Sequence, residues 1–238
     1  MRKVILKGNN QEFKKYEELS LNKYTMILKN IVSITIIILA LNGCSKKSEP
    51  KIPSADNLLF NNLEKGSYNI ITSESEMKWI GKELSTKTHT GTLMLKNGKI
   101  EINDNGVIHG NVEIDMKTIN VTDMVGGGKV KLEGHLNSSD FFNVNKYPSA
   151  FITFQNEKMP VVNNQINLTG KLTIKEITHP ISFTAELLQV KPTLKVKASM
   201  SFDRSKYNVR FRSGKFFENL GDKLILDDID VAVLMVSN

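Results

Sequence analysis

The sequence has few of the residues from which covalent staples and catalytic centres are usually built. It contains 238 residues and one cysteine, which excludes an internal disulfide framework and a cysteine-based zinc cluster. The four histidines are scattered singly and show none of the H-x-H, H-x-x-x-H or H-E-x-x-H spacings of metal sites. A G-x-S-x-G nucleophile elbow and a Cys/His pair are also lacking. We therefore predict no metal, no other cofactor and no enzyme activity.

Two local clusters resemble functional motifs but do not fit them. Gly126–Lys129 is a glycine run followed by lysine, but it lacks the spacing and the Ser or Thr of a phosphate-binding loop, so we interpret it as a mobile loop. Asp222, Asp227, Asp228 and Asp230 surround the last strand-like segment, whereas calcium would need a tighter, loop-like spacing. We interpret these aspartates as strand-edge charge that blocks unwanted pairing.

Positive charge is concentrated near the N-terminus. The net charge is +7, and residues 1–43 contribute +4 of it through seven Lys/Arg and three Glu. A nucleic-acid-binding protein would be expected to carry its positive charge on the folded part of the chain. We therefore do not expect nucleic acid to be a partner.

An uncharged apolar run follows in the same region, and it is short. Residues 31–41 read IVSITIIILAL, whereas a transmembrane helix needs about 20 such residues. The run has the length of the apolar region of a secretory signal, and Lys29 precedes it. The next residues, Leu41-Asn42-Gly43-Cys44, resemble a bacterial lipobox, in which the chain is cut before the cysteine and the cysteine is acylated. The alternative is that Cys44 only ends a buried apolar segment.

The lipobox defines the expected processing and location. Residues 1–43 would be a signal peptide, with translation starting at Met26, and palmitate-type acyl chains on Cys44 would give stable anchoring. Ser45 stands where an Asp would retain an enterobacterial lipoprotein in the inner membrane. We therefore expect a protein of the bacterial cell envelope, anchored in the outer membrane and facing the periplasm. Residues 44–66 hold prolines and many charged residues, which is typical of a flexible tether.

From residue 67 on, apolar and polar residues alternate. A period of two predicts a strand with one apolar and one polar face, and it is clearest in four segments, 166–174, 181–187, 194–202 and 229–235. Asn97-Gly98 and Asp104-Asn105-Gly106 are predicted hairpin turns. Lys129–Phe142 and Phe216–Gly221 interrupt the alternation and are predicted to form short helical turns. Residues 67–238 are therefore predicted to form one all-β domain, an antiparallel barrel or sandwich with one or two short helices.

A closed barrel of about eight strands has an interior that is filled by side chains or holds one small ligand. Apolar residues that stay in phase along successive strands face that interior. The candidate lumen residues are Trp79, Leu93, Leu95, Ile114, Phe183, Leu187, Met200, Val231 and Val233.

Four segments between Tyr68 and Val236 carry a resemblance to the YceI-like family. The HL-x-S-x-DFF signature of that family is similar to GHLNSSDFFNVNKYPSAFITF at 134–154. The family's G-x-L segment resembles NLTGKLTIKEITHPISF at 167–183. Its D-R segment resembles SFDRSKYNVRF at 201–211, and its i-D-m segment resembles EIDMKTINVTD at 113–123. The sequence departs from the family pattern at Glu176, where glycine is usual, and near the start of the domain, where His89 stands without a second histidine.

The resemblance implies a lipocalin-like antiparallel β-barrel with a helical segment at Lys129–Ser138. It also implies a secreted or periplasmic protein whose barrel binds a polyisoprenoid or another long-chain lipid. We therefore expect an envelope lipoprotein that binds, carries or sequesters an amphiphile, with that lipid and the membrane as its partners. The alternative is a non-catalytic structural or interaction protein of the envelope with a filled barrel.

Overall fold

The computed structural model describes residues 58–84, 87–156 and 163–238. The predicted signal peptide, Cys44 and most of the tether at 44–66 lie outside these residues, so their interpretation stays a prediction. The helical elements of the described chain are α2 (Leu58–Asn61), α3 (Gly126–Asn137) and the 3₁₀ turns η2 (Thr72–Glu74), η3 (Arg204–Tyr207) and η4 (Gly221–Lys223). The strands are β1 (Gly66–Asn69), β2 (Glu76–Lys82), β3 (Thr88–Ile102), β4 (Ile108–Val121), β5 (Ser149–Gln155), β6 (Gln165–Ile174), β7 (Ile177–Gln189), β8 (Leu194–Asp203) and β9 (Asp228–Ser237).

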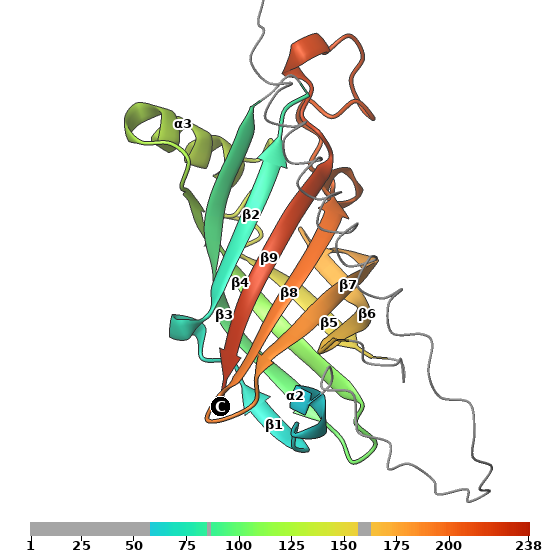
Figure 1. The fold of residues 1–238 in the computed structure, drawn as a ribbon. Helices are drawn as coiled ribbons and strands as arrows, with labels where there is room; N and C mark the ends of the chain where they lie inside the picture. The colour runs from blue at the N-terminus through green and yellow to red at the C-terminus, as the bar shows by residue number, and fades with distance from the viewer. Residues whose placement is uncertain (1–57, 85–86, 157–162) are drawn as a thin grey trace, which may run out of the picture. The chain divides into compact units, whose positions relative to one another are not determined.

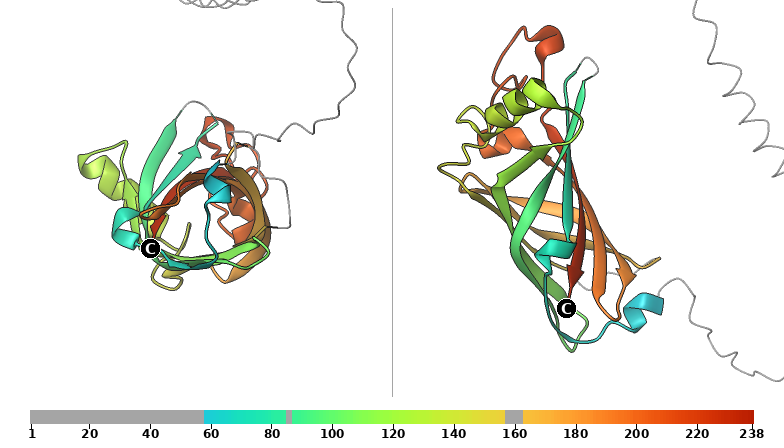
Figure 2. Two further views of the ribbon diagram at one scale, coloured as in Figure 1. Left: turned by 60° about the horizontal axis from the view of Figure 1, so that its bottom comes forward. Right: turned by 90° about the vertical axis from the view of Figure 1, so that its left-hand side faces the viewer.

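The strands of the described chain form one antiparallel sheet that closes on itself. Their hydrogen-bonded order is β1-β3-β2-β9-β8-β7-β6-β5-β4, and the further pairing of β3 with β4 completes the ring. The closed wall consists of β2–β9, while β1 pairs only with the end of β3. Figures 1 and 2 show these strands wound around a common axis. The predicted antiparallel lipocalin-like barrel with one or two short helices is confirmed. Within the described residues, no helix is long and apolar enough to cross a membrane.

The alternation of apolar and polar residues produces the barrel wall. In β6, Ile166, Leu168, Leu172 and Ile174 are buried, while most residues between them are exposed. Full burial of each such side chain stabilises the fold by about 1.5–3 kcal/mol. A register slip of one residue would turn the whole set outward, so the pattern also fixes how β6 pairs with its neighbours.

The prediction of a hairpin at Asn97-Gly98 is wrong. β3 runs through both residues, and its pairing with β4 shifts register between Leu95 and Asn97, which marks a bulge. The Asn97 amide donates to the Glu113 carboxylate at 2.6 Å, and a Cβ on Gly98 would lie 2.5 Å from Cδ1 of Ile70. Gly98 therefore serves close packing rather than a turn. The chain reverses at 103–107 instead, where Gly106 has a φ of 70°, as the second turn signal predicts.

The β6–β7 hairpin turns on Lys175 and Glu176, whose φ values are 51° and 63°. Such two-residue turns favour glycine or asparagine because both φ angles are positive, which explains why glycine would suit the position of Glu176. The Lys175 ammonium donates to the carbonyl oxygens of Phe141 at 3.0 Å and Asn208 at 2.8 Å. Burial lowers the pKa of this ammonium. The turn is thus tied to two other segments of the chain.

One end of the barrel, which we call the α3 end, carries α3 and the segment 204–227 (Figures 1 and 2). α3 begins at Gly126, so the interpretation of Gly126–Lys129 as a mobile loop is wrong. The helix is held to β4 because Lys129 donates to Asn120 Oδ1 at 2.7 Å and the Val121 amide donates to Glu133 at 2.8 Å.

The predicted helical turn at Phe216–Gly221 is also wrong. Only η4 forms there, and Gly221, with a φ of 50°, begins it instead of ending a helix. Phe216 and Phe217 are 43% and 49% exposed. A helix of this length would therefore bury too little apolar surface to offset the entropy of ordering its residues.

The segment 204–227 is fixed by a buried cation, Arg204, whose exposed fraction is 0%. Its guanidinium donates to the carbonyl oxygens of Val209, Phe211, Ile225 and Leu226 at 3.0–3.3 Å, and it pairs with Asp227 at 3.2 Å. The interpretation of the aspartates as strand-edge charge is therefore wrong for Asp227. It is also wrong for Asp230, because β9 is paired on both sides and Asp230 binds Lys82 at 3.1 Å.

The opposite end of the barrel, which we call the α2 end, is covered by apolar side chains. Phe60 and Leu63 pack against the core from α2 and the residues after it. The Lys191 ammonium binds Glu64 at 2.6 Å, and the Tyr68 hydroxyl donates to the Glu64 carbonyl at 2.8 Å. The predicted domain start at residue 67 stays untested, but it leaves out three apolar side chains that contact the barrel, those of Leu59, Phe60 and Leu63.

Candidate functional site

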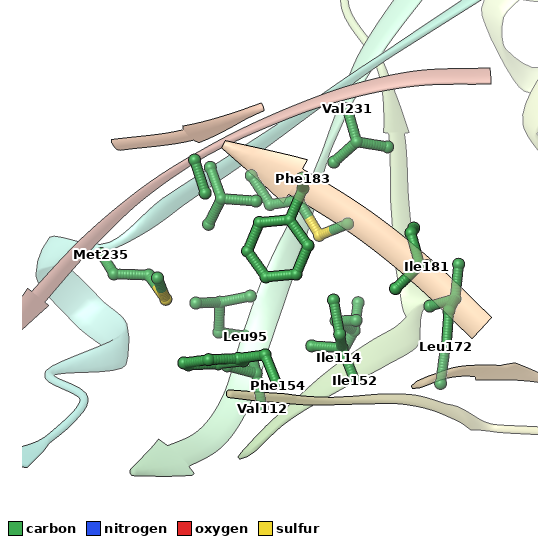
Figure 3. Close-up of a cluster of buried hydrophobic side chains, with 14 of the residues drawn as sticks. Leu95, Val112, Ile114, Ile152, Phe154, Leu172, Ile181, Phe183, Val231 and Met235 are labelled. Atoms are coloured by element: carbon green, nitrogen blue, oxygen red, sulfur yellow. The ribbon is translucent and has the colours of Figure 1, made fainter. Parts of the chain in front are cut away.

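The barrel encloses a cavity of about 210 Å³. A cavity of about 150 Å³ lined by Leu, Ile and Phe is known to stay dry and to bind benzene, so this cavity has room for a larger apolar group. Every strand of the closed wall contributes apolar side chains to it. Figure 3 shows Leu95, Ile114, Ile152 and Val231 pointing from different strands toward a common centre.

The structure brings eight of the nine predicted lumen residues to this cavity, namely Trp79, Leu93, Leu95, Ile114, Phe183, Met200, Val231 and Val233. Leu187 lies elsewhere, against a second cavity of about 40 Å³. Leu187 is in phase with Phe183, so the period of two places both on the inner face. The period does not indicate how far along the barrel axis a residue lies. Contact of any of these residues with a ligand stays a prediction.

Several wall residues were missed by the sequence reasoning. Ile152 and Phe154 are in phase with Ala150 along β5, so the alternation in that short strand could have identified them. Phe141 and Phe211 lie outside the strands. They reach the cavity only because the chain folds back over the α3 end, and no local period predicts that.

The cavity becomes polar toward the α3 end. The polar side chains among its lining residues are Lys82, Glu83, His89, His135 and Arg212, which we call the polar rim. Lys82 at the end of β2 pairs with Asp230, and the Arg212 guanidinium lies 5.1 Å from the centroid of the Phe211 ring. The site is thus amphipathic, with an apolar wall and a charged edge.

A hydrogen-bonded pair orients one side of the rim. His89 Nδ1 lies 2.9 Å from Asp123 Oδ2, and the Thr90 amide donates to Asp123 Oδ1, also at 2.9 Å. Partial burial raises the pKa of Asp123, but the hydrogen bonds from Thr90 and His89 together outweigh this effect. The pKa of Asp123 therefore lies below its usual value. The carboxylate therefore stays ionised and holds His89 in place at the start of β3.

Trp79 is the one tryptophan of the sequence, and it lines the cavity. Its ring lies across Gly91, where an added Cβ would come within 2.3 Å of Cζ2. Its indole nitrogen is buried without a hydrogen-bond partner. A buried donor in that state costs about 1–3 kcal/mol. Trp79 is therefore both a part of the wall and a spectroscopic reporter of what occupies the cavity.

The arrangement suits the shielding of an apolar group. Burial of a hydrocarbon tail stabilises a complex by about 0.8 kcal/mol per CH₂. Most residues of the cavity wall are apolar and can contribute only such burial. In the described part of the chain, no group of three or more His, Cys, Asp and Glu side chains could hold a metal ion. The Lys82 and His89 side chains lie at the rim and are paired with Asp230 and Asp123.

Solved structures share this barrel. BcnA from Burkholderia cenocepacia aligns with a TM-score of 0.57 at 18% identity, over 71% of this chain and 99% of BcnA. A polyisoprenoid binding domain from Saccharophagus degradans aligns with a TM-score of 0.50 at 12% identity, over 72% of this chain and 97% of that domain. At these identities the likeness establishes the fold.

Curated relatives match a shorter part of the chain. Protein YceI of Shigella flexneri is 35% identical over 71 residues, which is 30% of this chain and 36% of that protein. A UPF0312 protein of Pseudomonas paraeruginosa is 37% identical over 71 residues, with the same coverage. The aligned part is thus about a third of the length of these relatives. The model of the YceI-like domain matches residues 68–236, nearly the whole described barrel, and the chain therefore belongs to the YceI-like domain family.

Proposed function

We propose that this protein binds an amphiphile and holds its isoprenoid or long-chain tail inside the barrel. The observation that carries the proposal is the apolar cavity of about 210 Å³ that ends at a polar rim. The tail would lie against Leu95, Ile114 and Phe183, and the head group would lie at the rim beside Lys82 and Arg212. A tail of about ten buried carbon atoms would suffice for micromolar affinity after the cost of association.

Two other observations favour binding over the alternatives. A filled barrel would leave no space of this size, because protein interiors are close-packed. The related barrel from Saccharophagus degradans is described as a polyisoprenoid binding domain, which supports an isoprenoid as one class of tail. We propose a carrier or sequestering protein and not an enzyme, since most of the residues that line the cavity are apolar.

The test is to identify what the purified protein carries. The full chain would be expressed with its own leader in a bacterial host and extracted with organic solvent, and the extract would be analysed by mass spectrometry. We expect an apolar-tailed lipid in near-stoichiometric amount. The matched control is Ala150→Phe, because Ala150 lines the cavity and a phenyl ring there would occupy the space of the tail. A parent protein that carries no lipid would contradict the proposal.

We further propose that the protein is a lipoprotein anchored through Cys44, in the outer membrane and facing the periplasm. The support is the sequence pattern of residues 31–44. Cys44→Ser should remove the acyl mass and shift the protein from the detergent phase to the aqueous phase, while Ser45→Ala should leave both unchanged. Fractionation of inner and outer membranes tests the location. An unchanged mass in Cys44→Ser would overturn the anchor.

A further inference from the structure

The barrel contains two apolar cavities in series, and two residues separate them. The larger cavity, of about 210 Å³, continues to the polar rim at the α3 end. The smaller one, of about 40 Å³, lies against Phe60 and Leu63 at the α2 end. Phe154 of β5 and Met235 of β9 line both cavities. These two side chains therefore form a partition across the barrel.

The neighbouring strands hold the Phe154 ring in place. Phe154 pairs with Gly110 of β4 on one side and with Gly170 of β6 on the other. A Cβ on Gly110 would lie 2.6 Å from Cζ of Phe154, so the ring occupies the space that the missing side chain leaves. On its inner side the ring meets Phe183 edge-on, with centroids 5.9 Å apart.

Met235, the second residue of the partition, has a more flexible side chain than Phe154. Met235 reaches in from β9 (Figure 3), and, like Phe154, it lines both cavities. Methionine is unbranched and adapts to its surroundings, whereas the Phe154 ring is confined by its neighbours. Phe154 therefore provides the rigid part of the partition and Met235 the adaptable part.

We propose that Phe154, with Met235, sets the maximum length of the tail that the barrel accepts. This inference rests on the proposed function, since it assigns a specificity role within the same cavity. A tail that enters from the polar rim would fill the larger cavity and stop at the Phe154 ring. Each methylene up to that point adds buried apolar surface, whereas a longer tail would have to bend back or leave its excess in water.

The experiment measures affinity against chain length on the full chain. Saturated fatty acids of about 8 to 20 carbon atoms would be titrated, with Trp79 fluorescence as the readout, and isoprenoid alcohols would form a second series. In the parent protein we expect affinity to rise up to about fourfold per added methylene, which corresponds to about 0.8 kcal/mol. Beyond a defined length the affinity should stop rising.

The variant Phe154→Ala should shift that limit to longer chains by about three or more carbon atoms, because truncation enlarges the space and joins the two cavities. Phe154→Leu and Met235→Ala should give smaller shifts and serve if Phe154→Ala does not fold. The matched control is Phe151→Ala, since Phe151 lies in the same strand and is 46% exposed on the outer face. It should leave the limit unchanged.

Different results would overturn the length limit and the binding function. If the parent binds tails without a length limit, or if the limit stays in place in folded Phe154→Leu and Met235→Ala, the partition does not set tail length, and the binding function stands. If neither the fatty acids nor the isoprenoid alcohols change the Trp79 signal of the parent, the binding function itself is overturned.

Discussion

The two ends of the barrel are held together by different kinds of contact. At the α2 end, apolar side chains such as Phe60 and Leu63 cover a cavity of about 40 Å³. At the α3 end, the irregular segment 204–227 is held by the fully buried Arg204. That end also carries the polar rim and gives onto the cavity of about 210 Å³.

The difference shows how one sheet can be covered by apolar packing at one end and by buried polar contacts at the other. At the α2 end, apolar side chains from α2 and the residues after it pack on the core, and the Lys191–Glu64 ion pair lies at the surface. Long irregular segments leave carbonyl groups without ladder partners, and buried carbonyls need donors. Arg204 supplies donors to four of them. The α3 end therefore depends on polar contacts, and the α2 end depends on packing.

The largest expected effect comes from breaking the α3 end. Arg204→Met should destabilise the fold by about 3–5 kcal/mol, because Asp227 and four carbonyl groups lose their buried partner. Urea unfolding of the parent and the variant would measure the loss. Lys206→Met, in the same 3₁₀ turn but exposed, is the control and should stay within about 0.5 kcal/mol of the parent. A loss below about 1 kcal/mol in Arg204→Met would show that other contacts hold this end.

The second-largest expected effect is a loss of stability when a phenyl ring is added to the smaller cavity, compared with the same addition to the larger cavity. Ala185 lines the smaller cavity and Ala150 the larger one, and both are 3% exposed. Ala185→Phe should cost about 1–3 kcal/mol, because a cavity of that size cannot take a phenyl ring without strain. Ala150→Phe should cost less than about 1 kcal/mol and lower fatty acid affinity at least about tenfold. Equal losses of stability in the two variants would contradict the difference in free space.

The smallest effect lies away from both ends, on the outer wall. Glu113 accepts hydrogen bonds from Lys96, Ser149 and Asn97, and these contacts, with Lys96 first, lower its pKa to about 2. In the unfolded chain the pKa of Glu is about 4.3. The carboxylate therefore contributes stability that is fully present above about pH 5 and is lost as the pH falls toward 2.

The variant Glu113→Gln isolates this contribution. Its stability should fall less steeply than that of the parent between about pH 5 and pH 2. The midpoint of urea unfolding, measured across that range for both proteins, checks the expectation. Parallel pH profiles would mean that Glu113 gains nothing from its three partners.

The sequence predicts the wall of this barrel better than its ends. Ile166, Leu168, Leu172 and Ile174 alternate with polar residues, and each is buried as expected, because the pleat of a strand imposes a period of two. Asn97-Gly98 shows the limit of local signals. The pair has the composition of a turn, but the packing of Ile70 on Gly98 and the bulge in β3 decide its structure, and both depend on distant parts of the chain.

The candidate site follows the same division. Period two places Phe183 and Leu187 on the inner face, but not in their separate cavities, because depth depends on how the strands are staggered in the closed barrel. Phe141 and Phe211 reach the cavity from irregular segments, so no period could indicate them. The role of Arg204 was not predicted either, since nothing in the local sequence shows which carbonyl groups will surround it.

The most direct test of the central claim is whether an apolar tail lies next to Trp79. A fatty acid with bromine atoms along its chain quenches a tryptophan only on close approach, and Trp79 is the one tryptophan of the sequence. We expect saturable quenching with one ligand per chain, reversal by the unbrominated fatty acid, and strongly weakened binding in folded Ala150→Phe. Absent or non-saturable quenching in the parent, or equal quenching in Ala150→Phe, would contradict a lipid-binding cavity.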